Sequence, residues 1–285
     1  MSTHAAIDST GDATGMQGRE FAWTNADFDR VQDLIYRRAG ISLHDGKHAM
    51  VYSRLSRRLR DTGHQSFKEY LSWLESTDGP EWQEFVNALT TNLTSFFREQ
   101  HHFQIFAEHL KSKPATHPWR VWCSAASTGE EPYSIVMTAL EALGSRPRFS
   151  LMASDIDSKV LATAANGVYK GESLKGISAA QMQAYFMRGK GSNSGLVRVK
   201  PELKQLVEFL IVNLIKDDWP FKEAFDVVFC RNVMIYFDAE TQRRVLERIH
   251  RVMKPGGVLF VGHAENFSDS RDLFVLKGKT AYERR

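Results

Sequence analysis

The stretch with the most chemical content runs from Val121 to Ser134 and reads VWCSAASTGEEPYS. Its apolar start predicts a buried strand, and its small residues predict a tight turn into a helix. Thr128 and Glu131 have the spacing of a capping box at the start of that helix. A strand that turns directly into a helix is where doubly wound α/β sheets bind a cofactor. The sequence therefore predicts a cofactor site at this turn.

The composition of the turn selects among cofactors. It holds one glycine, Gly129, followed by Glu130 and Glu131, and it lacks the glycine patterns of NAD, FAD and P-loop sites. A pyrophosphate needs close approach of the backbone and is repelled by carboxylates, whereas a cationic cofactor tolerates both features. S-adenosylmethionine, with an adenosine, a sulfonium and no phosphate, fits better. Glu130 could bind its ammonium or sulfonium, or it could only complement the helix dipole.

A second acidic residue is placed for cofactor binding. Asp155 follows the predicted strand Phe149–Ser154. An acid at this point of a doubly wound sheet binds ribose hydroxyls. The alternative is a cap on the next helix, which is the better interpretation for Asp157. The turn Lys254–Gly257 before a later strand is also frequent in S-adenosylmethionine-dependent methyltransferases.

Two patterns of apolar residues predict the elements that position these groups. From about residue 24 to 89 the spacing is helical, which predicts an all-α domain of about four helices. After Pro118, strands alternate with helices, which predicts a mainly parallel sheet covered on both faces, with a final antiparallel hairpin near 273–283. The predicted strands are Arg120–Cys123, Phe149–Ser154, Val207–Val212, Phe225–Cys230 and Val258–Gly262, and the predicted helices are Pro132–Leu143, Ser158–Ala165 and Ala239–Val252.

The connection between Ala165 and Val207 is longer than a crossover needs. Within it, Tyr185–Arg188 and Leu196–Val199 predict two short strands around a glycine-rich loop, so we expect a small inserted β subdomain at about 168–204. The predicted organisation is a disordered N-terminus (1–20), a helical domain (21–90), a linker and helix that contribute to the cofactor site (91–118), and the α/β domain with its insertion (119–285).

Charge, hydropathy and cysteine content limit the classes of function. A net charge of +3 over 285 residues argues against a dedicated nucleic-acid-binding protein, and no apolar run is long enough to cross a membrane. The first residues do not have the pattern of a secretory signal. Cys123 and Cys230 lack metal-ligand spacing, so we expect buried thiols, no metal site and a cytoplasmic protein.

Four motifs, in order, resemble one family. They are NALTTNLTSFFRE at 87–99, SAASTGEEPYS at 124–134, ASDID at 153–157 and CRNVMIYF at 230–237. Together they resemble the CheR chemotaxis receptor methyltransferases, and the similarity runs from about residue 24 to the end. The resemblance implies a Rossmann-like S-adenosylmethionine-dependent methyltransferase sheet with a C-terminal antiparallel hairpin, an inserted β subdomain and an all-α N-terminal domain.

The same resemblance implies an activity and its residues. The family transfers a methyl group from S-adenosylmethionine to glutamate side chains of bacterial chemoreceptors, which adapts signalling and leaves S-adenosylhomocysteine. The implied cofactor-binding residues are Asn92, Thr94, Arg98, Glu130, Asp155, Asn213, Leu214, Arg231 and Asn232. Arg98 and Tyr236 are implied at the reaction centre, although Tyr236 taken alone would equally suit a core aromatic. A glutamate is already ionised at neutral pH, so no general base is required.

Two surfaces are candidates for receptor binding. Lys47, Arg54, Arg57 and Arg58 form a basic helix face that could meet glutamate-rich receptor helices, or could be an ordinary solvated face. In the insertion, Arg188, Gly189, Gly191 and Arg198 resemble family members whose β subdomain captures the C-terminal pentapeptide of the receptor. Strand addition at a free edge would be the physical basis, and a loop that merely covers the sheet is the alternative.

The expected partners are therefore the methylation helices of a chemoreceptor and its C-terminal pentapeptide, and the expected protein is a monomer that is recruited to membrane-bound receptors. No binding to nucleic acid or insertion into the membrane is expected. Two other functions remain open at this point: a non-catalytic receptor-binding sensor of S-adenosylmethionine, and a NAD-dependent oxidoreductase on a similar fold. The missing glycines disfavour the oxidoreductase.

Overall fold

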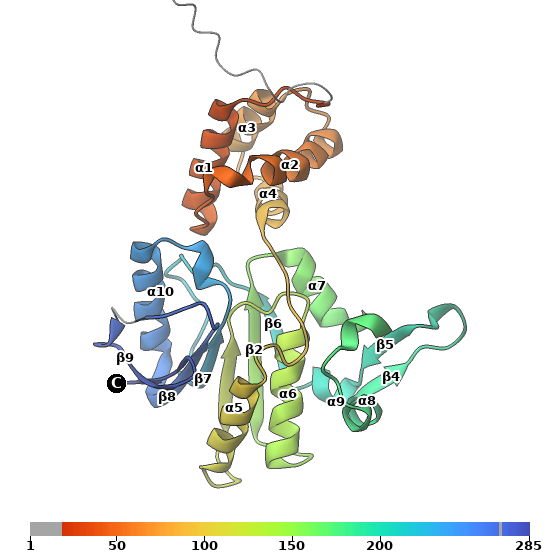
Figure 1. Cartoon of the computed structure of the whole chain (residues 1–285), viewed down its shortest axis with the longest axis vertical. Helices are drawn as coiled ribbons and strands as arrows, with labels where there is room; N and C mark the ends of the chain where they lie inside the picture. Colours follow the sequence, from red (N-terminus) through yellow and green to blue (C-terminus); the bar gives the residue numbers. More distant parts are fainter. Residues whose placement is uncertain (1–18, 268–269) are drawn as a thin grey trace, which may run out of the picture.

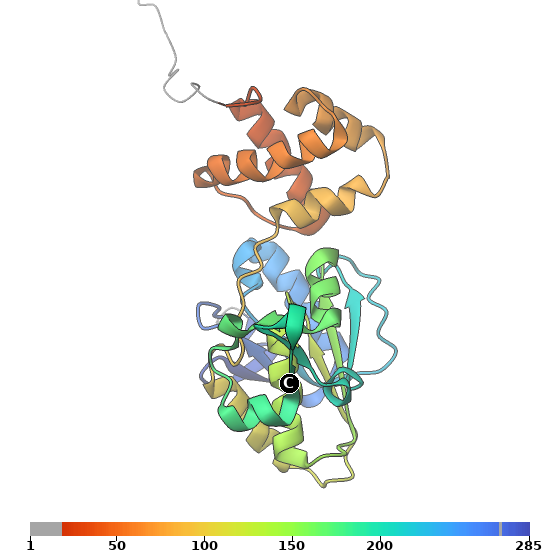
Figure 2. The same ribbon diagram turned by 90° about the vertical axis from the view of Figure 1, so that its right-hand side faces the viewer.

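The computed structural model describes residues 19–267 and 270–285. Most of the predicted disordered segment 1–20 lies outside the described residues. The described chain forms a helical part that stands above an α/β part, joined by the linker that follows residue 89 (Figures 1 and 2). None of the described helices is long and apolar enough to cross a membrane.

Four helices make the upper part: α1 (Asn25–Ala39), α2 (His48–Thr62), α3 (Phe67–Ser76) and α4 (Glu81–Leu89). Their apolar faces meet in one core, in which Val31, Leu55 and Leu71 are fully buried. Helix α1 begins in a capping box formed by Thr24 and Asp27. The periodic spacing of the apolar residues correctly predicted these helices.

A seven-stranded sheet makes the lower part, in the order β6-β2-β1-β7-β8-β10-β9. Its strands are β1 (Trp119–Cys123), β2 (Phe149–Asp155), β6 (Val207–Ile211), β7 (Phe225–Cys230), β8 (Met253–Val261), β9 (Phe274–Gly278) and β10 (Ala281–Arg284). The first five are parallel, whereas β10 runs antiparallel to both β8 and β9. The predicted fold class, including the C-terminal hairpin, is confirmed.

Helices cover both faces of the sheet. α5 (His101–Lys111) and α6 (Glu130–Leu143) pack on one face, and α10 (Ala239–Val252) packs on the other. α7 (Ser158–Asn166) connects β2 to the insertion. One boundary differs from the prediction: β8 begins at Met253 and includes the turn-like Lys254–Gly257. The register of β8 against β7 shifts there, so the strand accommodates these residues as an irregularity.

The insertion is a separate three-stranded sheet in the order β3-β5-β4. Its strands are β3 (Val168–Lys170), β4 (Phe186–Arg188) and β5 (Leu196–Val199), and α8 (Ala179–Tyr185) and α9 (Pro201–Lys204) flank them. It projects from the side of the α/β domain (Figure 1). The sequence predicted two of the strands and missed β3, because three residues are too few to show an alternating pattern.

Direct contacts seat the helical part on the carboxyl end of the sheet. The Tyr36 hydroxyl donates to Asp238 at 2.6 Å, and the Asn213 amide donates to the carbonyl of Arg38 at 2.8 Å. Gly40 ends α1 with φ 72°, and a Cβ atom there would lie 2.5 Å from Ile215. The helical part therefore covers the edge of the sheet where a doubly wound fold binds its ligand.

Candidate active site

A cavity of about 310 Å³ opens at the carboxyl ends of the parallel strands, below the helical domain. Its volume lies within the range of small-molecule sites. Most residues predicted to bind the cofactor line this cavity, and so does Tyr236: Asn92, Thr94, Arg98, Asp155, Asn213, Leu214, Arg231 and Asn232. The fold thus brings together positions that are more than 140 residues apart in the chain (92 to 236).

Glu130 is the predicted cofactor residue that does not line the cavity. It is buried, its carboxylate accepts a 2.6 Å hydrogen bond from the Thr128 hydroxyl, and burial raises its pKa. The predicted capping box of Thr128 and Glu131 is wrong. The N-cap of α6 is Gly129, with φ 101° and no side-chain cap. A Cβ atom at Gly129 would lie 2.6 Å from the Tyr169 hydroxyl, so the entry into this helix requires glycine.

Glu131 belongs to a buried ion network instead of a helix cap. Its carboxylate lies 2.6 Å from the guanidinium of Arg231, which also lies 3.4 Å from Glu99 and donates to the carbonyl of Arg98. Burial raises the pKa of Glu131, and Arg231 opposes that rise. Arg231 is fully buried as a side chain, so its charge is compensated within the protein. It ties α6, the loop after β7 and the linker together at the cavity, which both Arg231 and Glu131 line.

Backbone hydrogen bonds fix the carboxylate of Asp155, which lines the cavity and can accept hydrogen bonds from a ligand. Its two carboxylate oxygens accept from the backbone N–H groups of Ser127 at 2.8 Å and Asp157 at 3.0 Å, and only 8% of the residue is exposed. Burial raises its pKa to about 6. Asp157 caps α7 through Lys159 and Val160, so the predicted cap is confirmed. The Asn92 amide donates to the other oxygen of Asp157 at 2.8 Å, which fixes the linker above this strand.

The loop after β7 carries Asn232 and Tyr236. Asn232 has φ 57°, a left-handed conformation that is uncommon outside glycine. Tyr236 is only partly buried and lines the cavity, so it is not a core aromatic. Its carbonyl accepts a 2.8 Å hydrogen bond from the backbone N–H of Ser42 in the helical domain. This contact brings the loop between α1 and α2 to the cavity, where His44 and Lys47 also contribute.

Arg98 approaches the cavity from the linker. One guanidinium nitrogen donates to the carbonyl of Leu93 at 3.0 Å, which bends the side chain back toward the linker. Its neighbours Phe97 and Glu99 both have positive φ, at 51° and 57°. The sequence motif marked this segment but could not predict the left-handed turns, since neither residue type favours them.

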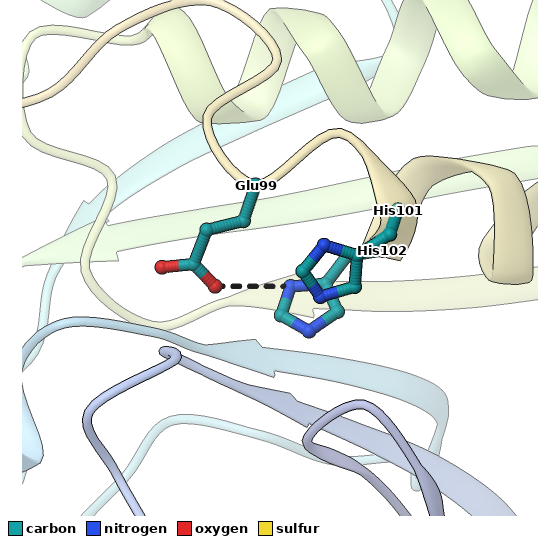
Figure 3. Close-up of side chains that lie close together, drawn as sticks. All are labelled: Glu99, His101 and His102. Carbon is teal, nitrogen blue, oxygen red and sulfur yellow. Dashed lines mark ion pairs between the residues drawn. The ribbon is translucent and has the colours of Figure 1, made fainter.

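Glu99, His101 and His102 present three possible metal ligands within 4.8 Å of one another (Figure 3). Their surroundings disfavour a cation. Arg231 lies 3.4 Å from the same carboxylate. Burial and Arg231 lower the pKa of His102 to about 4, so this ring is neutral near pH 7. The ring is fixed by contacts of its Nε2 with Lys279 and Thr280, both at 2.9 Å. We therefore assign this group to the packing around Arg231.

The predicted basic face on α2 is only partly free. Arg58 is not available for docking: its guanidinium forms a two-pronged pair with Glu81, at 2.8 and 2.6 Å, and its side chain is 13% exposed. Glu81 in turn accepts from the Tyr70 hydroxyl at 2.8 Å. Arg54 donates to the carbonyl of Thr90 at 2.7 Å and so fixes the end of α4. Arg57, with an 80% exposed side chain, fits the expected surface role.

The predicted peptide-binding residues lie in the insertion. Arg188 and Arg198 are both exposed, but the register pairs Met187 with Arg198 and Arg188 with Val197, so the two arginines lie on opposite faces of the small sheet. Strand β4 is at the edge of that sheet. A side chain at Gly189 would collide with the carbonyl of Asn193, and Gly191 has φ 58°, so both glycines shape the loop between β4 and β5.

Comparison with known proteins shows the family to which the chain belongs. Residues 92–282 match the family model "CheR methyltransferase, SAM binding domain", and residues 26–90 match "CheR methyltransferase, all-alpha domain". The chain belongs to the CheR methyltransferase family. A protein of Escherichia coli named "Chemotaxis protein methyltransferase" is 51% identical over 263 residues, which is 92% of this chain and 91% of the relative. A protein of the same name from Salmonella typhimurium is 52% identical, over 93% of this chain and 92% of the relative.

Membership of the CheR family identifies the enzyme class and the cofactor. The chain is a methyltransferase that uses S-adenosylmethionine, and the oxidoreductase and non-catalytic alternatives are not favoured. The cavity agrees with this cofactor, because it offers the buried carboxylate of Asp155 as a hydrogen-bond acceptor and is walled by apolar side chains such as Leu214.

Proposed function

We propose that this CheR family member transfers the methyl group of S-adenosylmethionine to glutamate side chains of bacterial chemoreceptors and forms glutamate methyl esters. The observation that carries the proposal is similarity along both parts of the chain to relatives named for chemotaxis protein methylation. A match confined to the α/β domain would support a methyltransferase but would not indicate its substrate. The match to the all-α domain extends the similarity to the part that covers the cavity.

The proposed chemistry places few demands on the protein. A glutamate with a pKa of about 4.3 is ionised at neutral pH and is itself the nucleophile. S-adenosylmethionine, when bound, supplies a methyl group on a positively charged sulfur. The protein has to bring two opposite charges into line and to exclude water from both.

Arg98 and Tyr236 are the proposed substrate-handling residues. Both line the cavity, and they approach it from different segments, the linker and the loop after β7. Among the residues that the structure describes, the guanidinium of Arg98 bonds only to the carbonyl of Leu93, so its other donors can orient a carboxylate. The Tyr236 hydroxyl can donate a hydrogen bond to the same group. A full ion pair would weaken the nucleophile, so we assign Arg98 to orientation.

The contacts with the cofactor are proposed from the positions of the lining residues in the cavity. Asp155 would accept from the ribose hydroxyls, and Asn213 and Leu214, after β6, would border the base. Asn92, Thr94 and Asn232 would surround the remainder of the cofactor. Arg231 and Glu130 would act indirectly, because the first is neutralised by Glu131 and the second lies outside the cavity.

Two surfaces are proposed to hold the receptor. Arg57, exposed on α2, gives a positive charge for a glutamate-rich receptor helix, and Lys47 extends it to the mouth of the cavity. The edge strand β4 is proposed to bind the C-terminal pentapeptide of the receptor by strand addition, with Arg188 near its carboxylate. Such tethering would recruit the enzyme, as a monomer, to membrane-bound receptors.

A receptor truncation tests the tether apart from catalysis. We expect binding to a receptor cytoplasmic fragment to weaken when its last five residues are removed, because the second contact and its effective concentration are lost. The measurement is calorimetry with intact and truncated fragments, and Arg188→Glu should remove the difference between them. Equal affinity for the two fragments would count against the tether and would leave the methyl-transfer proposal intact.

The chemical proposal needs its own experiment. The enzyme, S-adenosylmethionine and a receptor cytoplasmic fragment are incubated, and peptides are examined by mass spectrometry. We expect each modified glutamate to gain one methyl group, and a fragment with those glutamates changed to alanine to gain none. Methylation on lysine or on another residue type would refute the proposed product.

A further inference from the structure

The loop that presents Asn232 and Tyr236 to the cavity has a support that is not itself part of the cavity wall. Asn232 stands at φ 57°, a left-handed conformation that asparagine tolerates better than most residues other than glycine. Residues 234–236 follow at once as a single short 3-10 turn. So short a turn has few contacts of its own, and contacts from elsewhere in the fold hold it in one conformation.

Glu265, in the turn after β8, supplies those contacts. One carboxylate oxygen accepts from the backbone N–H of Asn232 at 3.0 Å, and the other accepts from the N–H of Met234 at 2.8 Å. The first oxygen also accepts from the N–H of Gly262. Glu265 is 4% exposed, and among the described residues it has no ion-pair partner within 4.0 Å. Backbone dipoles of the active-site loop therefore stabilise a buried carboxylate.

Packing gives a second, independent reason for the same fixed geometry. A Cβ atom at Gly262 would overlap the Asn232 amide group and would lie 2.9 Å from both the Asn232 backbone nitrogen and the Glu265 carboxylate. Gly262 and Glu265, which follow β8, thus both pack against the main chain of Asn232, which follows β7. The Asn232 amide is further held by Glu99, at 3.3 Å. These contacts restrict the side chain of Asn232, which lines the cavity.

We propose that Glu265 is a positioning residue for methyl transfer, which acts through the backbone of Asn232 and Met234 to set the side chains of Asn232 and Tyr236. This inference rests on the proposed function for its catalytic consequence. Glu265 does not line the cavity, so it does not act by touching cofactor or receptor. The ionised carboxylate accepts all three N–H groups, whereas an amide replaces one of its oxygens with a donor that faces at least one of them.

The test compares Glu265→Gln with a matched control, Asp226→Asn. Asp226 lies at the start of β7, whereas Asn232 follows its end. Asp226 is also a buried carboxylate that accepts from a backbone N–H, that of Arg120 at 2.9 Å, and it differs from Glu265 in having ion-pair partners, Lys254 at 2.8 Å and His117 at 2.9 Å. We expect Glu265→Gln to lower kcat at least tenfold and to weaken S-adenosylhomocysteine binding severalfold, with the KM for the receptor fragment within twofold. Asp226→Asn should lower the melting temperature without lowering kcat.

A second variant perturbs the same contact without changing Glu265. Gly262→Ala should reproduce the loss of kcat, and the double variant should lose little more than either single variant, because both act on Asn232. The low-pH side of the kcat profile should also change in Glu265→Gln, whose amide does not titrate.

Three results would overturn the inference: unchanged kcat and affinity in a folded Glu265→Gln protein, an equal loss of kcat in Asp226→Asn, or additive effects in the double variant. Failure of the proposed function is distinguishable from these, since the unmodified enzyme would then transfer no methyl group to the receptor fragment. The cofactor-affinity comparison would still test the contact between Glu265 and the loop.

Discussion

Replacing Asp155 by asparagine is expected to separate cofactor binding from stability. The change keeps the volume of the side chain but removes its charge and replaces one acceptor oxygen with a donor. Hydrogen bonds to a charged acceptor are worth about 1.5–3 kcal/mol, so a lost ribose contact should weaken affinity about 10- to 150-fold. The assay is calorimetric titration of S-adenosylhomocysteine at pH 7.5, and Asp226→Asn is the control for loss of a buried carboxylate.

The same substitution should raise the stability of the protein, relative to the unmodified protein, as the pH rises. Burial raises the pKa of Asp155 from 3.8 to about 6, so between these values the folded state binds more protons than the unfolded state. The contribution of this group to stability therefore falls as pH rises from about 4 to about 6, by roughly 3 kcal/mol. Asparagine does not titrate, so the stability of Asp155→Asn relative to the unmodified protein should rise over that pH window.

Cofactor affinity of the unmodified enzyme should show the matching dependence. Ribose hydroxyls bind the ionised carboxylate, so affinity should fall as pH is lowered through about 6, and the Asp155→Asn variant should lose that dependence. Unchanged affinity of the variant at pH 7.5 would refute the ribose role. An identical melting temperature difference at pH 4.5 and pH 7.5 would refute the raised pKa.

The other residues give shorter predictions. Arg98→Ala should lose most methyl transfer and keep its circular dichroism and melting temperature; normal receptor methylation would remove it from the reaction centre. Arg57→Glu should raise the KM for the receptor fragment, more at low salt than at high salt, because its side chain is exposed. Arg58→Met should instead leave that KM unchanged and lower the free energy of unfolding by about 3 kcal/mol, because Glu81 is left buried without its partner. Equal effects of the two arginine variants on KM would contradict this division.

Much of the fold follows from local pattern. The five parallel strands and the flanking helices were predicted because β-branched and aromatic runs alternate with helical spacing, and β7 and α10 have the predicted bounds. The register shift in β8 was not predicted, since Lys254–Gly257 has the composition of a turn. These residues lie between the pairs Phe225–Met253 and Val227–Val258, so the strand pairs with β7 on both sides of them.

The errors in the site arise from long-range pairing. Thr128 and Glu131 have the local spacing of a capping box, but Arg231 is 100 residues away from Glu131 and takes the carboxylate into a buried ion pair. Arg58 was mispredicted for the same reason. The helix pattern places it on a basic face, but an ion pair with Glu81 of another helix buries its guanidinium. Local spacing cannot predict which distant charge a side chain will meet. Glu265 has no sequence signal beyond its place after a strand.

Labelled methyl transfer followed by alkaline hydrolysis tests the central proposal most directly. The enzyme is incubated with a chemoreceptor cytoplasmic fragment and S-adenosylmethionine labelled in its methyl group, and the isolated receptor is treated with base. A glutamate methyl ester is hydrolysed, so we predict that the label is incorporated into the receptor and then released as methanol. Label that stays on the receptor in base, or that is never transferred, would contradict the account.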